Sequence, residues 1–176
     1  SDQVHPSMKD DNWSSFSGKK QYQQKRDEVS MLKSFTQITN EMVPQIIDVV
    51  GTEGFNSEEE AIEDLTEKIN EYKKFPNPVK LYRIVAVKDK KLINTKNLGE
   101  HYTPYKWNID GDMLMSIGYE NWDDDWEPYI MEVWAPLDQI DVLQTLIQNM
   151  AFPNEHENNL KNRGKGAKFI KAYKYK

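Results

Sequence analysis

The chain has 176 residues and a net charge of −6, and 38% of its residues are hydrophobic. With 5 Trp, 9 Tyr and 6 Phe, it holds too many large apolar side chains to be wholly disordered, so we expect a globular fold. Cysteine is absent, which excludes disulfides, thiolate metal sites and a cysteine nucleophile. No long apolar run occurs, and no basic segment followed by an apolar one opens the chain, so we expect neither a membrane span nor a signal peptide.

The chain begins with a polar segment that is followed by a helical pattern. Residues 1–27 are rich in Ser, Asp, Gln and Lys and show no sustained hydrophobic period, which predicts a partly ordered polar arm. Over residues 28–50, apolar side chains recur every three or four positions, as they do on one face of a helix. Pro44 lies inside this pattern, so we expect either a kinked helix or two helices.

A further helix is predicted from its capping signal. Ser57 followed by Glu60 is a capping-box pattern, in which each side chain accepts a hydrogen bond from a backbone amide at the start of the helix. Apolar residues then form one face, and the helix is expected to end by Phe75 because two prolines follow. Residues 28–75 are therefore expected to form the helical part of one domain that spans residues 28–176.

After this helix the pattern changes to strands. Residues 79–87 are rich in β-branched side chains and predict a strand, whereas the glycines, proline and asparagines of residues 94–111 predict mostly loop. Met113–Tyr119 and Tyr129–Trp134 are two more predicted strands, and an acidic segment separates them.

The last part of the chain combines one helix with short strands. Asp138 is predicted to cap a helix over residues 138–150. A short strand near 155–160 and a terminal strand over 167–175 are expected to follow. Residues 76–176 would thus be a β-rich core with one helix. Because helices come first and strands mostly second, the sequence predicts the α+β class.

Charge is distributed unevenly along the chain. Residues 161–176 hold seven Lys or Arg and no acidic residue, so residues 1–160 carry a net charge of −13. One interpretation is that the basic segment docks on nucleic acid or on the phosphates of a ligand. The interpretation that we favour places these lysines on the solvent side of a terminal strand, where they discourage edge pairing. The acidity of the remaining chain argues against nucleic acid as a partner.

The sequence lacks the common catalytic motifs. It contains neither GxxxxGK[ST] nor GxGxxG, so neither of the familiar phosphate-binding loops is expected. HExxH is absent among only 3 His, and GxSxG is absent as well, which disfavours a zinc hydrolase and an α/β-hydrolase triad. We expect no metal site.

Three local features nevertheless suggest chemistry. Arg83 lies inside an apolar strand, where its guanidinium needs a carboxylate, a group of carbonyls or a ligand phosphate. Gly99 to Thr103 is a polar and aromatic segment at the start of a loop. Glu155 and Glu157 would share one face of a strand, close enough for acid–base or charge-stabilising work. The structural alternatives are a buried ion pair for the arginine and plain solvation for the two carboxylates.

Taken in chain order, the three features match a known pattern. Leu81-Tyr82-Arg83, the segment that ends at Thr103 and Glu155-x-Glu157 shortly before Gly166 resemble the ADP-ribosyltransferases of the Arg–Ser–Glu class. The stretch from Tyr129 to Glu157 looks particularly like compact bacteriophage and prokaryotic proteins with that fold. The resemblance covers roughly residues 30–176.

The resemblance implies a fold and an NAD site. The fold would have N-terminal helices packed on two small, mainly antiparallel sheets, with NAD bound between the sheets. Arg83 would hold the pyrophosphate or ribose of NAD through charge-assisted hydrogen bonds. Thr103, with His101 and Tyr102 beside it, would stand where the family has a Ser-Thr-Ser segment and would position the nicotinamide ribose.

The resemblance also implies catalytic roles for two carboxylates. Glu157 would accept a hydrogen bond from the ribose 2′-hydroxyl and stabilise positive charge as nicotinamide leaves. Glu155 would orient and activate the acceptor. The Ser-Thr-Ser triplet itself is absent, and Asn158 stands where the family usually has an aliphatic residue, which leaves an inactive copy of the fold as an alternative.

The function implied is an NAD-dependent mono-ADP-ribosyltransferase, in chemical terms a glycosyltransferase, from a phage or bacterium and directed at a host macromolecule such as a protein. The alternative is an inactive phage structural or accessory protein that binds a protein partner. In that case Trp122 and Trp126, in the acidic segment, would suit a recognition loop. We expect a location in the cytoplasm of a host cell or in a virion, with no membrane partner.

Overall fold

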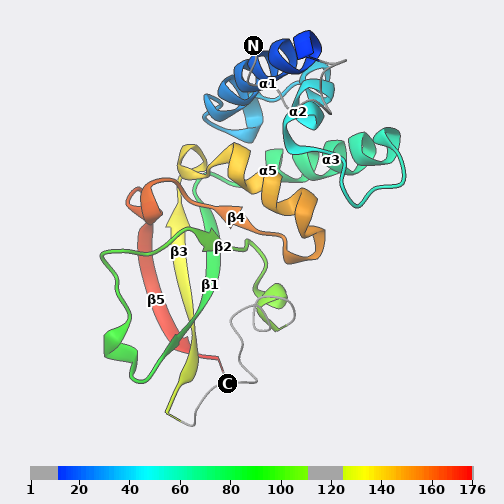
Figure 1. Cartoon of the computed structure of the whole chain (residues 1–176). Helices are drawn as coiled ribbons and strands as arrows, with labels where there is room; N and C mark the ends of the chain where they lie inside the picture. The colour runs from blue at the N-terminus through cyan, green and yellow to red at the C-terminus, as the bar shows by residue number, and fades with distance from the viewer. Residues whose placement is uncertain (1–11, 111–124, 176) are drawn as a thin grey trace.

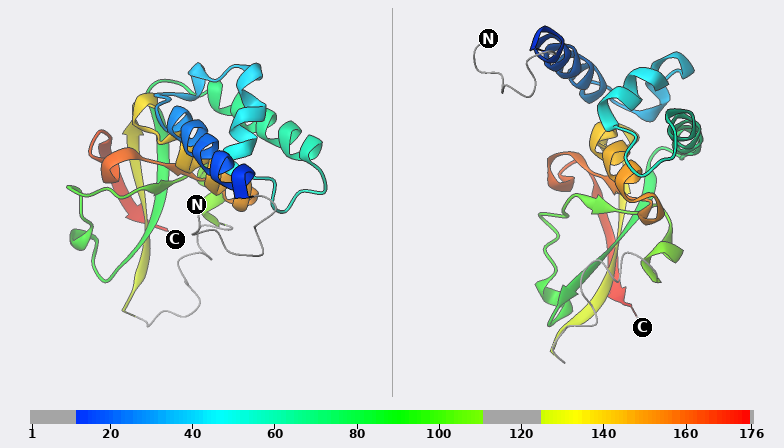
Figure 2. Two further views of the ribbon diagram at one scale, coloured as in Figure 1. Left: turned by 45° about the horizontal axis from the view of Figure 1, so that its top comes forward. Right: turned by 45° about the vertical axis from the view of Figure 1, so that its right-hand side comes forward.

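A computed structural model describes residues 12–110 and 125–175, with side chains described from residue 18. Within these ranges, four α-helices and five strands combine as the α+β class predicts (Figure 1). In chain order they are α1 (Asn12–Ser30), α2 (Val43–Val50), α3 (Glu58–Lys73), β1 (Val79–Val87), β2 (His101–Tyr102), β3 (Glu127–Ala135), α5 (Val142–Ala151), β4 (Asn158–Asn159) and β5 (Lys168–Lys174). The helices gather at one end of the molecule, and the long strands extend away from them (Figure 2).

Helix α3 begins and ends where its sequence signals predict. The Ser57 hydroxyl accepts a hydrogen bond from the Glu60 amide at 3.1 Å. The Glu60 carboxylate accepts from the amide of Asn56 at 3.1 Å, one residue before the expected partner. The helix ends at Lys73, before the two prolines.

The hydrophobic pattern of residues 28–50 belongs to two helices and the turns between them. Helix α1 ends at Ser30, and α2 begins at Val43 with Pro44 in its first turn. Proline is tolerated there because the first backbone amides of a helix have no partner within the helix. Of the two alternatives for Pro44, the separate helices are confirmed.

Helix α1 occupies part of the predicted polar arm. Residues 12–27 are helical, although their sequence has no hydrophobic period, while residues 1–11 lie outside the described part. Contacts with the rest of the fold hold the helix: Val29 near its end is buried in the main core, Lys25 pairs with Asp48 at 2.6 Å, and the Tyr22 hydroxyl donates to the Val49 carbonyl at 3.3 Å. Tertiary contacts, not amphipathic patterning, stabilise this helix.

The strands form two small antiparallel sheets. In the first, β3 lies between β1 and β5, so that Arg83 of β1 is opposite Met131 of β3. In the second, β2 pairs with β4. The three long strands match the predicted ranges within two residues, and the predicted strand Met113–Tyr119 lies outside the described residues. Strand β5 is an edge, and its lysines at positions 168, 171 and 174 are exposed, as expected.

The main core lies between the first sheet and the helices. Leu81 of β1 packs there with Leu65 of α3 and Leu146 of α5, all of them fully buried. Ile84 belongs to a separate small cluster with Ile109, because successive side chains of a strand point to opposite faces.

Two boundaries in the last third differ from the prediction. Helix α5 is capped by Asp141, whose carboxylate accepts from the Gln144 amide at 3.0 Å, while residues 137–139 form a short 3-10 turn. The strand predicted near 155–160 contains only Asn158–Asn159. A 3-10 turn precedes it and His156 has a φ of 46°, which interrupts extended backbone. No helix in the described ranges has the length and apolarity needed to span a membrane.

Candidate functional site

Strand pairing brings three of the sequence-predicted segments side by side. Tyr82 of β1 forms an antiparallel bridge with Thr103, directly after β2. Within the second sheet, Tyr102 lies opposite Asn158 of β4. The chain around Arg83, the 101–103 segment and the chain around Glu157 are therefore neighbours, although they are far apart in sequence.

Arg83 is held over the turn that precedes β2. Its Nη1 donates to the Leu98 carbonyl at 3.0 Å, and its guanidinium carbon lies 5.9 Å from the centre of the Tyr102 ring. Gly99 has a φ of +85°, and a Cβ added there would lie 1.4 Å from Nη1. The guanidinium therefore needs glycine at position 99. The carbonyl is one of the partners that the sequence predicts for an arginine in an apolar strand.

Glu157 is buried beside His101. Its carboxylate atom Oε2 lies 3.1 Å from His101 Nδ1, and the residue is 7% exposed. The contact is an ion pair and not a hydrogen bond, and Oε2 has no hydrogen-bond partner among the described residues. A buried carboxylate oxygen without a hydrogen bond is costly. Because Oε2 is itself buried beside His101, a ligand could donate a hydrogen bond to it only after the His101 side chain had moved aside.

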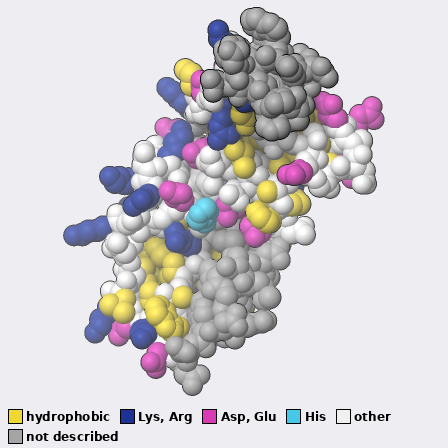
Figure 3. Space-filling model, in the orientation of Figure 1, with side chains coloured by type: hydrophobic (Ala, Val, Ile, Leu, Met, Phe, Trp, Pro, Cys, Tyr) yellow, Lys and Arg dark blue, Asp and Glu magenta, His cyan; other side chains and the backbone are white. Residues whose placement is uncertain are grey.

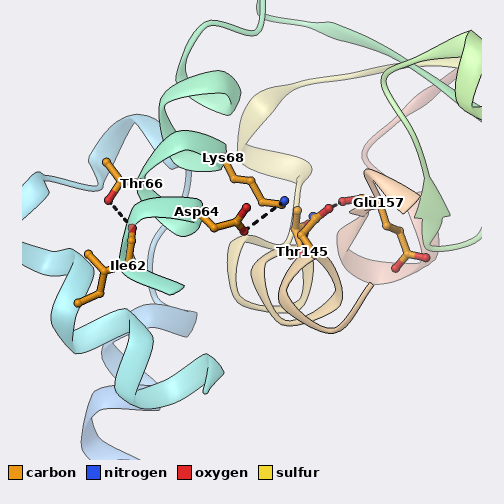
Figure 4. A network of polar contacts seen from close by, with 7 residues as sticks. Ile62, Asp64, Thr66, Lys68, Thr145 and Glu157 are labelled. Atoms are coloured by element: carbon orange, nitrogen blue, oxygen red, sulfur yellow. Dashed lines mark hydrogen bonds and ion pairs between the residues drawn. The ribbon is translucent and has the colours of Figure 1, made fainter. Parts of the chain in front are cut away.

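Helix α5 fixes the backbone of Glu157. The side chain of Asn149, which is fully buried, donates to the Glu157 carbonyl at 2.7 Å and also to the Thr145 carbonyl at 2.7 Å. Figure 4 shows the carboxylate of Glu157 directed away from this helix and from the Asp64–Lys68 ion pair. The backbone is therefore anchored in the core while the acid faces the second sheet.

Two adjoining hollows open beside this sheet. The first has a volume of about 280 Å³ and is lined by Arg83, Asn97, Gly99, Glu100, His101 and Arg163. The second has a volume of about 620 Å³ and is lined by Lys96, Asn97, Asn162, Arg163 and Lys165. Figure 3 shows Lys and Arg side chains gathered on the left of this face, near the histidine coloured cyan. The cations suit the phosphate groups of a ligand. The nearby buried carboxylate suits a ligand group on which positive charge develops during a reaction.

Tyr102 and Thr103 lie beneath this surface rather than on it. Both are fully buried. The Tyr102 hydroxyl donates to the Leu98 carbonyl at 2.5 Å, and burial raises its pKa to about 12, an effect that nearby Arg83 partly offsets. The Thr103 hydroxyl accepts from the Tyr105 amide at 3.3 Å. In this structure both side chains support the turn and the second sheet from the inside.

Glu155 is placed by a turn, so the expected strand alternation with Glu157 is wrong. The residue ends the 3-10 turn Pro153–Glu155, and left-handed His156 separates the two acids. The backbone carbonyl of Glu155 accepts a hydrogen bond from the Asn108 side chain, which ties the segment to the loop after β2. The two carboxylates therefore do not share a face by strand geometry.

Sequence reasoning missed an unusual turn next to Arg83. Asn162, Arg163 and Gly164 have φ values of 50°, 54° and 79° in succession. The amide of Gly99 donates to the Arg163 carbonyl at 3.1 Å, and a Cβ at Gly164 would lie 2.9 Å from the Gly99 carbonyl oxygen. Non-glycine residues in this region are strained and persist where surrounding contacts hold them. In the sequence, only Asn162 and Gly164 indicate this turn, because both residue types tolerate left-handed backbone.

An aromatic cluster beside Glu155 and Glu157 was also missed. The rings of Tyr105 and Trp107 stack at 5.4 Å, and His156 packs edge-on against Trp107 at 5.3 Å. Trp107 is 61% exposed. In the part of the chain that the structure describes, no group of three or more His, Asp or Glu side chains could hold a metal ion.

Comparison of the chain with protein-family models, with curated proteins and with solved structures found no match. The likeness to ADP-ribosyltransferases therefore stays a prediction from residues and their order. What the structure adds is the geometry around Arg83, His101 and Glu157.

Proposed function

We propose that this protein is an NAD-dependent mono-ADP-ribosyltransferase that transfers ADP-ribose to a macromolecular acceptor. The observation that carries the proposal is the neighbourhood of Arg83 and Glu157. The arginine and His101 line one hollow, and the same histidine forms an ion-pair contact with the buried Oε2 of Glu157, which has no hydrogen bond among the described residues. A cation for phosphate and a carboxylate for the developing charge are what the cleavage of NAD demands.

Arg83 is suited to hold the pyrophosphate. A guanidinium has five N–H donors in a fixed fork, and the hydrogen bond to Leu98 uses one of them. The remaining donors can face phosphate oxygens in the hollow. Because Leu98 and Gly99 fix the position of the group, little side-chain freedom is lost when a ligand binds.

Glu157 is suited to stabilise the breaking bond. When NAD is cleaved, nicotinamide leaves with the electron pair of its bond to ribose, and positive charge develops on the ribose. Oε2 of Glu157 would accept the hydrogen bond of the ribose 2′-hydroxyl and lie near this charge. The acceptor then forms a bond to the same ribose carbon and passes its proton to a general base, a role that the family resemblance, and not strand geometry, gives to Glu155.

The test is NAD binding followed by turnover. NAD at 100 times its dissociation constant should stabilise the wild-type chain by about 2.7 kcal/mol in thermal or chemical unfolding. Arg83→Ala should lose this stabilisation, whereas Glu157→Gln, which keeps the size of the side chain, should retain it but release no nicotinamide. The proposal fails if millimolar NAD stabilises none of the proteins.

A second candidate function is a binding module without catalysis. The observation in its favour is the aromatic cluster of Tyr105, Trp107 and His156, in which Trp107 is exposed and the other two are half-buried, since aromatic side chains are enriched at protein interfaces. Trp126 is 40% exposed under Lys88, and Trp122 lies outside the described residues. Wild-type protein that neither binds nor cleaves NAD would favour this candidate.

A further inference from the structure

The second hollow, beside the Arg83 site, carries more positive charge than a pyrophosphate requires. Lys96, Arg163 and Lys165 line it together with the amides Asn97 and Asn162, and none of the described lining residues is acidic. Because Asn97 and Arg163 also line the first hollow, a single ligand can extend from one into the other.

The backbone holds this charge in a defined place. Arg163 sits in the turn with three successive positive φ values, and its carbonyl accepts the hydrogen bond of the Gly99 amide. Gly164 lets the turn approach residues 98 and 99, where any larger residue would collide with the Gly99 carbonyl. Thus the turn that carries Arg163 is locked to the turn on which Arg83 rests. Strained backbone held by such contacts is typical of ligand sites.

We propose that this second hollow is a subsite for a phosphate monoester, so that the site also accepts, and binds more tightly than NAD, a dinucleotide with an extra phosphate on its adenosine ribose, as in NADP; the same cleavage would then transfer ADP-ribose that keeps this phosphate. The inference rests on the proposed function. A monoester adds almost two negative charges to those of the pyrophosphate, which matches the additional cations. Arginine and lysine are the side chains that recognise such groups, the first by its planar fork and the second as a point charge.

The test compares NAD with NADP on the full chain by titration calorimetry at about 0.05 and 0.15 M salt. Wild type should bind NADP about tenfold more tightly than NAD, and the difference should shrink at the higher salt concentration because the lining cations are exposed. Lys96→Gln and Lys165→Gln should each weaken NADP binding severalfold and leave NAD binding unchanged, since neither lysine lines the first hollow. Lys168→Gln is the matched control: it removes the same charge from an exposed position that lines neither hollow.

The outcomes separate this inference from the proposed function. If NAD binds in an Arg83-dependent way but NADP binds no better, or if Lys168→Gln weakens NADP as much as Lys165→Gln does, the subsite is overturned and the proposed function stands. Adenosine 2′,5′-bisphosphate and adenosine 5′-monophosphate provide a second comparison that needs no nicotinamide. A preference for the bisphosphate that is lost in Lys165→Gln would support the subsite even if neither dinucleotide were cleaved.

Discussion

The contact between Arg83 and Gly99 makes a sharp prediction about stability. In Gly99→Ala, the new Cβ would occupy the position of Nη1, 1.4 Å away, so the guanidinium has to leave the Leu98 carbonyl. Alanine at a φ of +85° also costs backbone strain. The matched control is Gly54→Ala, because Gly54 has a φ of +89° and a Cβ added there would have no heavy atom within 4 Å.

Both variants place alanine in left-handed backbone, but only Gly99→Ala also breaks the hydrogen bond of Arg83. Left-handed backbone costs about 1–2 kcal/mol for alanine, and this cost applies to both variants. Only Gly99→Ala also loses a hydrogen bond from a charged donor, worth about 1.5–3 kcal/mol. Gly99→Ala should therefore lower the free energy of unfolding by about 1.5–3 kcal/mol more than Gly54→Ala. Urea denaturation measures this difference, provided that the dependence of the unfolding free energy on urea concentration is the same for the two variants.

A double-mutant cycle identifies the cause. On an Arg83→Ala background the hydrogen bond is already absent, so the added Gly99→Ala change should cost no more than Gly54→Ala does. Equal destabilisation by Gly99→Ala and Gly54→Ala in the wild-type background would refute the reasoning, because it would mean that the guanidinium does not rest on position 99.

Two further predictions concern the buried polar groups. Burial raises the pKa of Tyr102 from 10 to about 12, so the unfolded chain loses the phenolic proton first as pH rises. Stability should therefore fall by about 2 kcal/mol between pH 10 and 12 through this group. Tyr102→Phe should remove that part of the pH dependence in denaturation curves, and an unchanged slope would show that the hydroxyl is not buried. Asn149→Leu leaves the carbonyl of Glu157 without its donor, and should cost about 1–3 kcal/mol of stability by the same assay. Full stability in this variant would indicate that water replaces the amide.

Local signals in the sequence determined most of the secondary structure. The capping pair Ser57 and Glu60 placed the start of α3, and the β-branched run at 79–87 placed β1, because each signal acts within a few residues. Helix α1 could not be predicted in this way, since residues 12–27 have no hydrophobic period and the helix is held by tertiary contacts, among them the burial of Val29 in the main core. The conformation around Glu155 was not predicted either, because a hydrophobic pattern does not reveal that His156 has left-handed backbone.

The candidate site, too, could be predicted from the sequence only in part. The sequence by itself determined that Arg83, inside an apolar strand, needs an electronegative partner, and it singled out Glu157 by residue type and order. Only the tertiary structure decided that the partner is the Leu98 carbonyl, that His101 approaches Glu157, and that the turn at Arg163 is locked against Gly99. These contacts join positions that are distant in the chain, and they depend on strand pairing and on close backbone approach. Neither leaves a periodic trace in the sequence. The sequence shows the basic segment 161–176, but only the folded chain shows that its Arg163 and Lys165 lie with Lys96 beside the Arg83 site.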